Sequence, residues 1–367
     1  MNEIQKKALG DAAGLVATPK TLEKVAAAIG SAEVARWAFT QWELRKRAAT
    51  KFVRADAMLF DREALEMAST EALARFHASR YPSGVPVIDI TVGIGADLMA
   101  LAARGPAVGY EIDTMRAEMA RHNLAVYDVT AELHASDGLG ARGDYVWADP
   151  ARREGGRRSS SIELAVPSPF AIRARFDGAK RLGIKLSPLS RDDELEQLGE
   201  TIEFVSFGGE CREALVWHGR DVEAEGFVAV HVESGDRLPR GGDLYEVAEP
   251  AEWFFEADPA AIRAHALDHF GADALGDSNG YLTASERIDS PWLKTYRVLY
   301  HGRGDWAETT RALRELNAST PELKQRGPKL DLSALRKKLR LKGSRPVYVA
   351  IWQVGASQKH TILETAE

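Results

Sequence analysis

The stretch Val85–Asp97, VPVIDITVGIGAD, constrains the fold more than any other part of the chain. Five of its first six residues are apolar and several are β-branched, which is typical of a strand buried on both faces of a parallel sheet. Gly93 and Gly95 then allow a tight turn, and Asp97 stands where an N-cap would open a helix over Leu98–Ala103. The stretch therefore predicts the first half of a nucleotide-binding βαβ unit.

Three further strands are predicted, and each one ends in polar residues. These strands and the residues at their ends are Ala107–Ile112 with Glu111 and Asp113, Ala131–Ala135 with Ser136–Gly138, and Tyr145–Ala148 with Asp149–Arg153. In an open α/β sheet, ligands bind at the carboxyl ends of the strands. An acid in the position of Glu111 can accept both hydroxyls of a ribose held over the first turn. The pattern therefore predicts a nucleoside site at this edge.

Two residues decide between a dinucleotide and S-adenosylmethionine as the ligand. A dinucleotide fingerprint requires a third glycine where Leu98 stands, so a pyrophosphate ligand is disfavoured. Asp89 precedes the turn, and an anion there suits the cationic end of S-adenosylmethionine, either directly or through water. The residues favour S-adenosylmethionine.

The segments DITVGIGAD, YEID, SDG and DPARR follow one another at the ends of the predicted strands. They resemble motifs I to IV of the class I S-adenosylmethionine-dependent methyltransferases, over roughly Val85–Trp217. The resemblance implies an α/β fold with a Rossmann-like seven-stranded sheet, in which Glu111 holds the ribose and Asp137 pairs with the adenine amine. The cofactor-binding residues that it implies are Asp89, Thr91, Gly93, Gly95, Asp97, Glu111, Ile112, Asp137 and Gly138.

The whole chain is similar to a narrower group, the bacterial methyltransferases with an N-terminal helical segment and a C-terminal THUMP-like domain. The segments that carry this similarity are WELRKRAATKF, DPARR, YLTASERIDSPWLKTYRV and RGPKLDLSALRKKLRLKG. The resemblance implies a helical domain over residues 1–82, a methyltransferase domain over 83–220 and an α+β THUMP-like domain over 221–367. Because THUMP domains present RNA to a catalytic partner, it also implies an RNA substrate such as rRNA or tRNA.

The segment Asp149-Pro150-Ala151-Arg152 stands where amine-methylating members carry Asp or Asn, two prolines and an aromatic residue. In those enzymes the first side chain and a backbone carbonyl orient the amine, and the aromatic ring stacks on the base. An arginine guanidinium can stack on a base or bind a phosphate bidentately. The predicted catalytic residues are therefore Asp149, Pro150 and Arg152, although adenine N6 methylation is less favoured than in members with the aromatic residue.

Arginine in this position also occurs in the 5-methyluridine RNA methyltransferases, which use a cysteine nucleophile. Cys211, in the predicted turn before the last strand of the sheet, is the single cysteine of the chain. The neighbouring acids Glu210 and Glu213 would raise its pKa and lower its thiolate fraction. An incidental role for this cysteine is the favoured interpretation.

Three basic segments are candidates for RNA contacts. The loop Arg152–Ile162, with Arg153, Arg157 and Arg158, is predicted to be a substrate loop beside the methyl donor, with an ordinary exposed loop as the alternative. A predicted helix over Leu332–Leu341 turns Leu332, Leu335 and Leu339 inward. Its expected outward phosphate contacts are Arg336, Lys337, Lys338, Arg340 and Lys342. For the basic stretch Arg45–Arg54, a solvated helix face is favoured over phosphate contacts.

Composition narrows the remaining possibilities. The net charge of -6 disfavours global affinity for nucleic acid, so RNA binding must rest on local patches. A single cysteine fits a reducing compartment, and the absence of a long apolar run or signal peptide predicts a cytoplasmic protein with no membrane partner. His265 and His269 have the spacing of metal ligands on a helix, but no third ligand is evident, so no metal is predicted.

Two other functions stay open from the sequence. One is a non-catalytic RNA-binding protein that retains a cofactor pocket, and the other is a methyltransferase that acts on a small molecule. The complete acidic series Asp89, Glu111, Asp137 and Asp149 favours an enzyme over the first of these. The basic C-terminal helix favours RNA over a small molecule.

Overall fold

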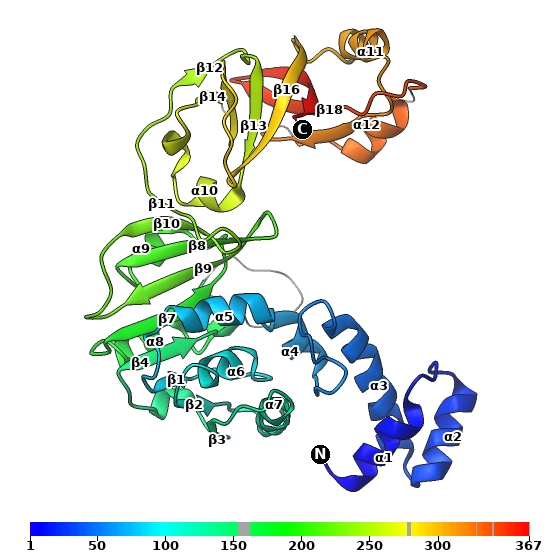
Figure 1. Cartoon of the computed structure of the whole chain (residues 1–367), viewed down its shortest axis with the longest axis vertical. Helices are drawn as coiled ribbons and strands as arrows, with labels where there is room; N and C mark the ends of the chain where they lie inside the picture. The colour runs from blue at the N-terminus through cyan, green and yellow to red at the C-terminus, as the bar shows by residue number, and fades with distance from the viewer. Residues whose placement is uncertain (153–161, 277–279, 328, 340, 367) are drawn as a thin grey trace. The chain divides into compact units, whose positions relative to one another are not determined.

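The computed structural model describes residues 1–152, 162–276, 280–327, 329–339 and 341–366 (Figure 1). The chain forms two compact units, one made of Met1–Thr201 with Leu215–Ala224 and the other of Ile202–Ala214 with Glu225–Glu367. The finer division into domains at residues 82 and 220 stays a prediction. Within the described residues, no helix combines the length and the apolar character that crossing a membrane requires.

Helices make up the first part of the chain, as the sequence predicts. They are α1 Glu3–Ala12, α2 Pro19–Ile29, α3 Ala32–Ala48, α4 Arg62–Met67 and α5 Glu71–Ser79. The start of α2 follows the expected pattern, since Thr18 accepts a hydrogen bond from the Thr21 backbone N–H at 3.2 Å and Pro19 takes the first helical position. Leu9, Val25 and Phe39 belong to an apolar cluster that joins α1, α2 and α3.

The larger sheet contains the predicted seven strands and two more. Its strands are β1 Val87–Asp89, β2 Ala107–Tyr110, β3 Glu132–His134, β4 Tyr145–Ala148, β7 Arg181–Leu186, β8 Thr201–Phe207, β9 Glu210–His218, β10 Gly226–His231 and β11 Arg237–Pro239. Their spatial order is β11-β10-β8-β9-β7-β4-β1-β2-β3, and β3, β2, β1, β4 and β7 are parallel to their neighbours in this series. The seven strands from β8 to β3 confirm the expected class I architecture. The sequence did not predict that β10 and β11 would extend it.

Short helices and a small ribbon connect these strands. They are α6 Ala96–Ala102, α7 Thr114–Val126, the 3₁₀ turns η1 Gly138–Gly140 and η2 Ile162–Leu164, the two-stranded ribbon β5 Ala151–Arg152 with β6 Ala165–Val166, and the helices α8 Pro169–Arg175 and α9 Asp192–Glu196. Figure 1 shows α5, α6 and α7 alongside the parallel strands. The carboxyl ends of β1, β2, β3 and β4 therefore meet at one edge, as the pattern predicted.

The second sheet has eight strands in the order β12-β14-β15-β13-β16-β19-β18-β17. Their bounds are β12 Glu246–Val247, β13 Trp253–Ala257, β14 Asp273–Leu275, β15 Tyr281–Ala284, β16 Leu293–Gly302, β17 Glu322–Gln325, β18 Tyr348–Val354 and β19 Ser357–Thr365. The helices that accompany it are α10 Pro259–Arg263, the 3₁₀ turn η3 Leu267–Phe270, α11 Trp306–Glu315 and α12 Leu332–Lys338. Phe254, Tyr281 and Trp352 are fully buried in its core. The α+β character predicted for this region is confirmed.

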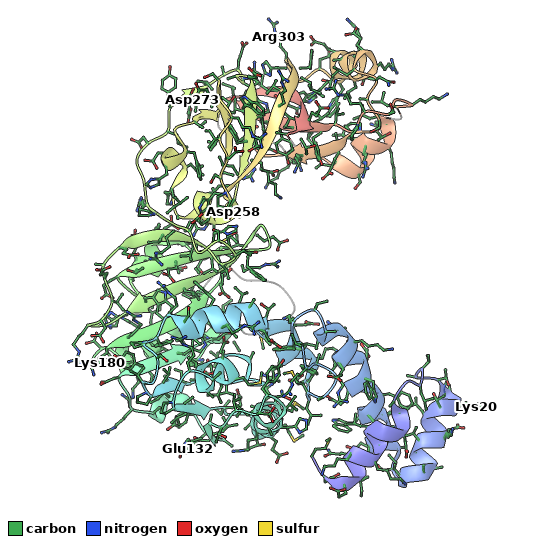
Figure 2. All side chains as sticks on the ribbon, viewed as in Figure 1. Lys20, Glu132, Lys180, Asp258, Asp273 and Arg303 are labelled. Carbon is green, nitrogen blue, oxygen red and sulfur yellow. The ribbon has the colours of Figure 1, made fainter. Side chains whose placement is uncertain are left out.

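The helix on which His265 and His269 were expected to lie is interrupted. Asp258, labelled in Figure 2, opens α10 by accepting a hydrogen bond from the Ala260 N–H at 2.8 Å, but α10 ends at Arg263 and His265 takes a left-handed φ of 54°. His265 stacks on Phe227, whereas the ring of His269 forms a hydrogen bond with the backbone carbonyl of Pro239. The two histidines therefore do not lie one turn apart on a helix. Among the described residues, no group of three or more His, Cys, Asp or Glu side chains could hold a metal ion.

Candidate active site

The glycine turn after β1 requires its two glycines. Gly93 has a φ of 57° and Gly95 a φ of 95°, both in the left-handed region that side chains rarely adopt. A Cβ at Gly95 would lie 3.3 Å from the Cβ of Ala120, whereas a Cβ at Gly93 would meet nothing within 4 Å. The space above Gly93 is open. The expected N-cap role of Asp97 is wrong, because Gly95 occupies that position and Asp97 lies inside α6, where its buried carboxylate has other partners.

Glu111 joins the end of β2 to the glycine turn. Its side chain is only 8% exposed, and its Oε2 accepts the Gly93 N–H at 2.7 Å while its Oε1 accepts the Asp113 N–H at 2.9 Å. Each carboxylate oxygen has two lone pairs, so one on each oxygen stays available for a ribose hydroxyl. The next residue, Ile112, is 74% exposed and offers an apolar surface beside the carboxylate.

Asp89 and Thr91 connect the end of β1 to β4. Asp89 is 1% exposed and accepts the Thr91 N–H at 3.0 Å. Burial, followed by repulsion from Asp97, raises the pKa of Asp89 well above its usual value. A cation placed beside this carboxyl would favour its charged form. The Thr91 hydroxyl in turn accepts a hydrogen bond from the backbone N–H of Asp149 at 2.6 Å. This bond connects the end of β1 to the end of β4.

The end of β3 contributes Asp137 and Gly138. Asp137 is exposed and caps η1 by accepting the Leu139 N–H at 2.9 Å. Gly138 is buried against β1, since a Cβ there would lie 2.4 Å from the carbonyl oxygen of Ile90. Because Gly138 has no side chain, the end of β3 can pack closely against the end of β1.

A buried polar network that the sequence did not predict lies behind Asp149. Lys185 of β7 places its Nζ 2.5 Å from Asp149 Oδ2, and the two side chains are 13% and 24% exposed. Lys185 also donates to Ser69 Oγ at 3.0 Å, and Ser69 donates to Asp97 Oδ2 at 3.1 Å. His77 completes the chain, with its Nδ1 2.7 Å from Asp97 Oδ1. A signal for Lys185 was present, namely a lysine inside the otherwise apolar segment GIKL.

Charge compensation holds this network together. Burial alone would raise the pKa of Asp97, but the interaction with His77 and the hydrogen bonds outweigh it, and the pKa is lowered. His77 stacks on Trp147 of β4, with ring centroids 4.6 Å apart. Burial, with the nearby charge of Lys185, lowers the pKa of Lys51 to about 8. The charges of Lys51, Lys185, Asp97 and Asp149 therefore influence one another at the carboxyl edge of the sheet.

The other two predicted catalytic residues, Pro150 and Arg152, lie after β4 and in β5. Pro150 is buried directly after β4. Arg152 lies in β5, where its backbone is paired with Ala165 of β6. The residues Arg153, Arg157 and Arg158 of the predicted substrate loop lie outside the described residues, as does Arg340 of the basic helix.

Cys211 has properties that disfavour a nucleophile. It lies inside β9 and not in the turn that the sequence predicted. Burial, followed by the charge of Asp258, raises the pKa of its thiol to about 12. A thiol with this pKa carries almost no thiolate at neutral pH.

The basic stretch Arg45–Arg54 serves internal contacts. Arg45 is 7% exposed and donates to the carbonyl of Met58 at 2.9 Å. Lys51 donates to the carbonyls of Leu65, Glu66 and Ala68, and Arg54 forms an ion pair with Asp128 at 2.8 Å. Arg45 and Lys51 therefore hold the helical segment together, and Arg54 joins it to the end of α7. Lys46 and Arg47 are exposed, which fits the favoured interpretation of a solvated face.

Asn123 of α7 makes a similar connection. It is fully buried, accepts the Leu59 N–H at 2.8 Å, and donates to the carbonyls of Leu59 at 3.0 Å and Ile94 at 2.9 Å. Since Ile94 lies between the two turn glycines, this one amide links the glycine turn to the segment before α4.

Asp97→Asn is expected to lower the free energy of unfolding by about 3 kcal/mol at neutral pH, because His77 loses a buried anionic partner. The pKa of Asp97 is lowered in the folded chain, so its contribution is complete above the unfolded pKa of about 3.9 and is lost as the pH falls through the folded value. Urea unfolding at neutral and acid pH measures this, with the exposed Asp11→Asn as control. A deficit that is equal at both pH values would contradict the assignment.

Comparisons with known proteins give three findings. Residues 293–367 match the family model described as THUMP domain-like. The chain is 33% identical over 346 residues to an uncharacterized S-adenosylmethionine-dependent methyltransferase of Mycobacterium tuberculosis, found in strains CDC 1551 / Oshkosh and ATCC 25618 / H37Rv, and this match covers 88% of the chain and 94% of the relative. A crystal structure of a candidate methyltransferase from Porphyromonas gingivalis W83 has a similar fold, with a TM-score of 0.76, 18% identity, and coverage of 100% of this chain and 95% of that one.

Proposed function

The chain belongs to the S-adenosylmethionine-dependent methyltransferases and is an enzyme that uses this cofactor, and we propose that its methyl acceptor is RNA. The main support is the surface formed by α12 and the residues that follow it. Arg336, Lys337, Lys338 and Lys342 are exposed, and no ion pair involving them occurs among the residues that the structure describes. They lie inside the segment that matches the THUMP domain-like model, and the resemblance to THUMP domains implies RNA.

Two cations that flank this surface in the sequence are paired with carboxylates. Lys324 pairs with Glu256 at 2.8 Å, and Arg345 pairs with Glu364 at 2.6 Å. The helix is shorter than predicted and ends at Lys338, but Leu332, Leu335 and Leu339 pack on the apolar cluster below it, as expected. The packing of these leucines leaves the free cations on the opposite, solvated face.

The residues at the sheet edge fit the cofactor. The space above Gly93 is open, and the buried carboxyl of Asp89, whose pKa is raised, suits a cationic group. Bound S-adenosylmethionine supplies a methyl group on a cationic sulfur. In this proposal Glu111 accepts the ribose hydroxyls, Asp89 faces the amino-acid part directly or through water, and Asp137 pairs with the adenine amine. The cofactor would also be bound by Thr91, Gly93, Gly95, Asp97, Ile112 and Gly138.

Asp149, Pro150 and Arg152 are proposed to position the nucleophile. Lys185 holds one oxygen of Asp149, so the carboxylate is fixed in place and keeps lone pairs for an N–H or O–H of the substrate. Holding the attacking atom in line with the methyl group is the main contribution available to these residues.

The proposal is tested with purified protein, tritium-labelled S-adenosylmethionine and total RNA from a strain that lacks the gene. Label in RNA that disappears with RNase, and that is absent with Asp149→Ala, is the expected result. Label that enters a small molecule or protein would refute the RNA assignment. No label at all, with cofactor binding confirmed by calorimetry, would favour a non-catalytic protein.

The double charge reversal Lys337→Glu and Lys338→Glu is expected to weaken RNA binding at least tenfold at low salt and to flatten its dependence on salt, because fewer counterions are released. Filter binding across a salt series measures both effects. The control is Lys20→Glu with Lys24→Glu on α2, which makes the same change in net charge at two exposed lysines (Figure 2 labels Lys20). Equal losses in both variants would point to net charge and not to α12.

A further inference from the structure

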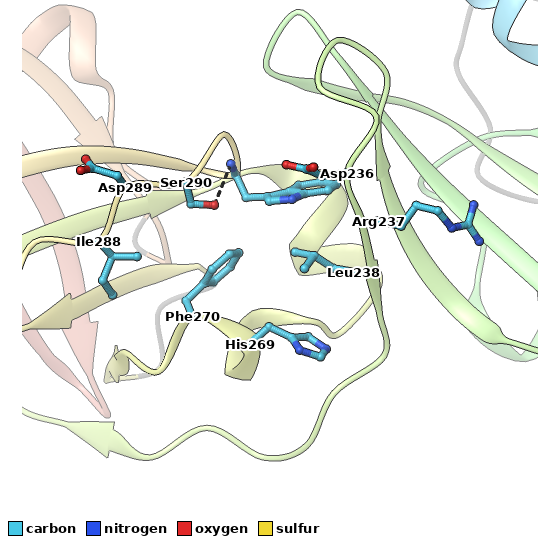
Figure 3. A pocket seen from close by; sticks show the side chains of 9 residues that line it. Asp236, Arg237, Leu238, His269, Phe270, Ile288, Asp289 and Ser290 are labelled. Atoms are coloured by element: carbon cyan, nitrogen blue, oxygen red, sulfur yellow. Dashed lines mark hydrogen bonds between the residues drawn. The ribbon is translucent and has the colours of Figure 1, made fainter.

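The unit that contains the second sheet has a cavity of about 360 Å³. It is formed around β11, η3 and the segment before β16, and Figure 3 shows Phe270 between Ile288 and Leu238. Trp292 completes the apolar lining. A volume of this size is in the range of pockets for small molecules. No role for this cavity follows from methyl transfer itself.

The cavity lining includes several polar side chains, and one of them, Arg237, is already paired with Glu203 and Glu225. Trp292 is 3% exposed, and its indole Nε1 is buried with no hydrogen-bond partner among the described residues. A buried N–H without an acceptor is unfavourable, but this atom is covered in the structure and is not exposed to a ligand. Two carboxylates, Asp236 and Asp289, lie at the exposed rim, and Asp289 pairs with Arg287 at 2.8 Å. Asp236 accepts no side-chain hydrogen bond within the described part of the chain.

We propose that this cavity takes an unstacked guanine base, and this inference rests on the proposed RNA substrate. Aromatic side chains such as Phe270, which is partly exposed in the lining, stack on single-stranded bases, whose edges are then read by hydrogen bonds. Guanine has two adjacent N–H donors on its Watson–Crick edge, which match the two oxygens of one carboxylate such as that of Asp236. The other three bases lack two adjacent donors. The acidic rim disfavours a phosphate, so the cavity suits the base and not the backbone.

Calorimetry with the full-length protein and the four free nucleosides tests this assignment. Guanosine is expected to bind at least tenfold more tightly than adenosine, cytidine or uridine. Asp236→Asn keeps the shape of the side chain and is expected to weaken guanosine binding by about tenfold. The matched control is Asp243→Asn, an exposed carboxylate outside the cavity lining, which should leave binding unchanged. Phe270→Ala should weaken binding of guanosine as well, and circular dichroism checks that this variant folds.

The opposite results are equally clear. Absence of guanosine binding up to millimolar concentration, or equal binding of all four nucleosides with no effect of Asp236→Asn, would overturn the assignment. Because free nucleosides require neither RNA nor methyl transfer, the result is independent of the labelling assay. RNA labelling without guanosine binding would leave the RNA substrate intact and remove the pocket. Guanosine binding without RNA labelling would do the reverse.

Discussion

Glu111→Ala is expected to weaken S-adenosylmethionine binding by roughly 30- to 150-fold, which corresponds to about 2 to 3 kcal/mol. In the proposed site, the variant removes the side chain that accepts the ribose hydroxyls. It also releases the Gly93 N–H, which Glu111 holds at 2.7 Å, and so loosens the turn under the cofactor. Isothermal titration calorimetry of the purified protein measures this without any knowledge of the methyl acceptor.

The control for this prediction is Glu118→Ala, an exposed glutamate on α7. It makes the same change of charge and volume a short distance along the chain, and its cofactor affinity should equal that of the wild type. Unchanged binding in Glu111→Ala would remove this residue from the site. Equal losses in both variants would show a general effect of charge.

Asp149→Asn and Lys185→Met are each expected to lower the single-turnover rate of methyl transfer by about 100-fold. Displacing a nucleophile by about 1 Å lowers a reaction rate by roughly that factor. The two side chains act as one unit, with Nζ and Oδ2 2.5 Å apart. The double variant should therefore lose little more than either single variant, whereas independent residues would give about 10⁴-fold. The readout is transfer of tritium label to RNA under saturating enzyme.

The chain contains a matched control for this pair. Lys180 and Asp144 form an ion pair at 3.0 Å just before the same two strands, β7 and β4, but their side chains are more exposed, at 41% and 53%. Exposed pairs contribute at most about 1 kcal/mol, so Lys180→Met should leave the rate unchanged. Cofactor affinity that stays near the wild-type value in Lys185→Met would separate positioning from loss of structure. Multiplicative losses in the double variant would contradict the coupling.

Local patterns were sufficient to predict the framework of the site. The boundaries of β4 match the prediction, and Glu111 follows β2 as expected, because a buried apolar strand that ends in polar residues has a strong local signature. The glycine turn was also predictable, since both Gly93 and Gly95 adopt left-handed angles that favour glycine. The roles of these residues in binding remain predictions for the experiments above.

Contacts between distant parts of the chain were not predictable in this way. Ser69 and His77 come from the helical segment before the sheet, yet both bind Asp97, and nothing in the surrounding helix pattern distinguishes them from ordinary polar positions. The N-cap interpretation of Asp97 used only its immediate neighbours and was wrong for that reason. Similarly, β11 was not predicted as part of the sheet, because its pairing with β10, and not its own sequence, makes it a strand.

The contacts of Asn123 limit how the gene for such a protein can be shortened or recombined. Its single amide binds Leu59 on one side and the glycine turn at Ile94 on the other, so the segment before the sheet and the turn under the cofactor share a buried connection. A gene shortened to begin at β1 would encode a turn that has lost this anchor, along with the Ser69 and His77 contacts to Asp97. Recombination that exchanges the early helices should therefore be tolerated only when these partners move together, and the two parts should evolve as one module.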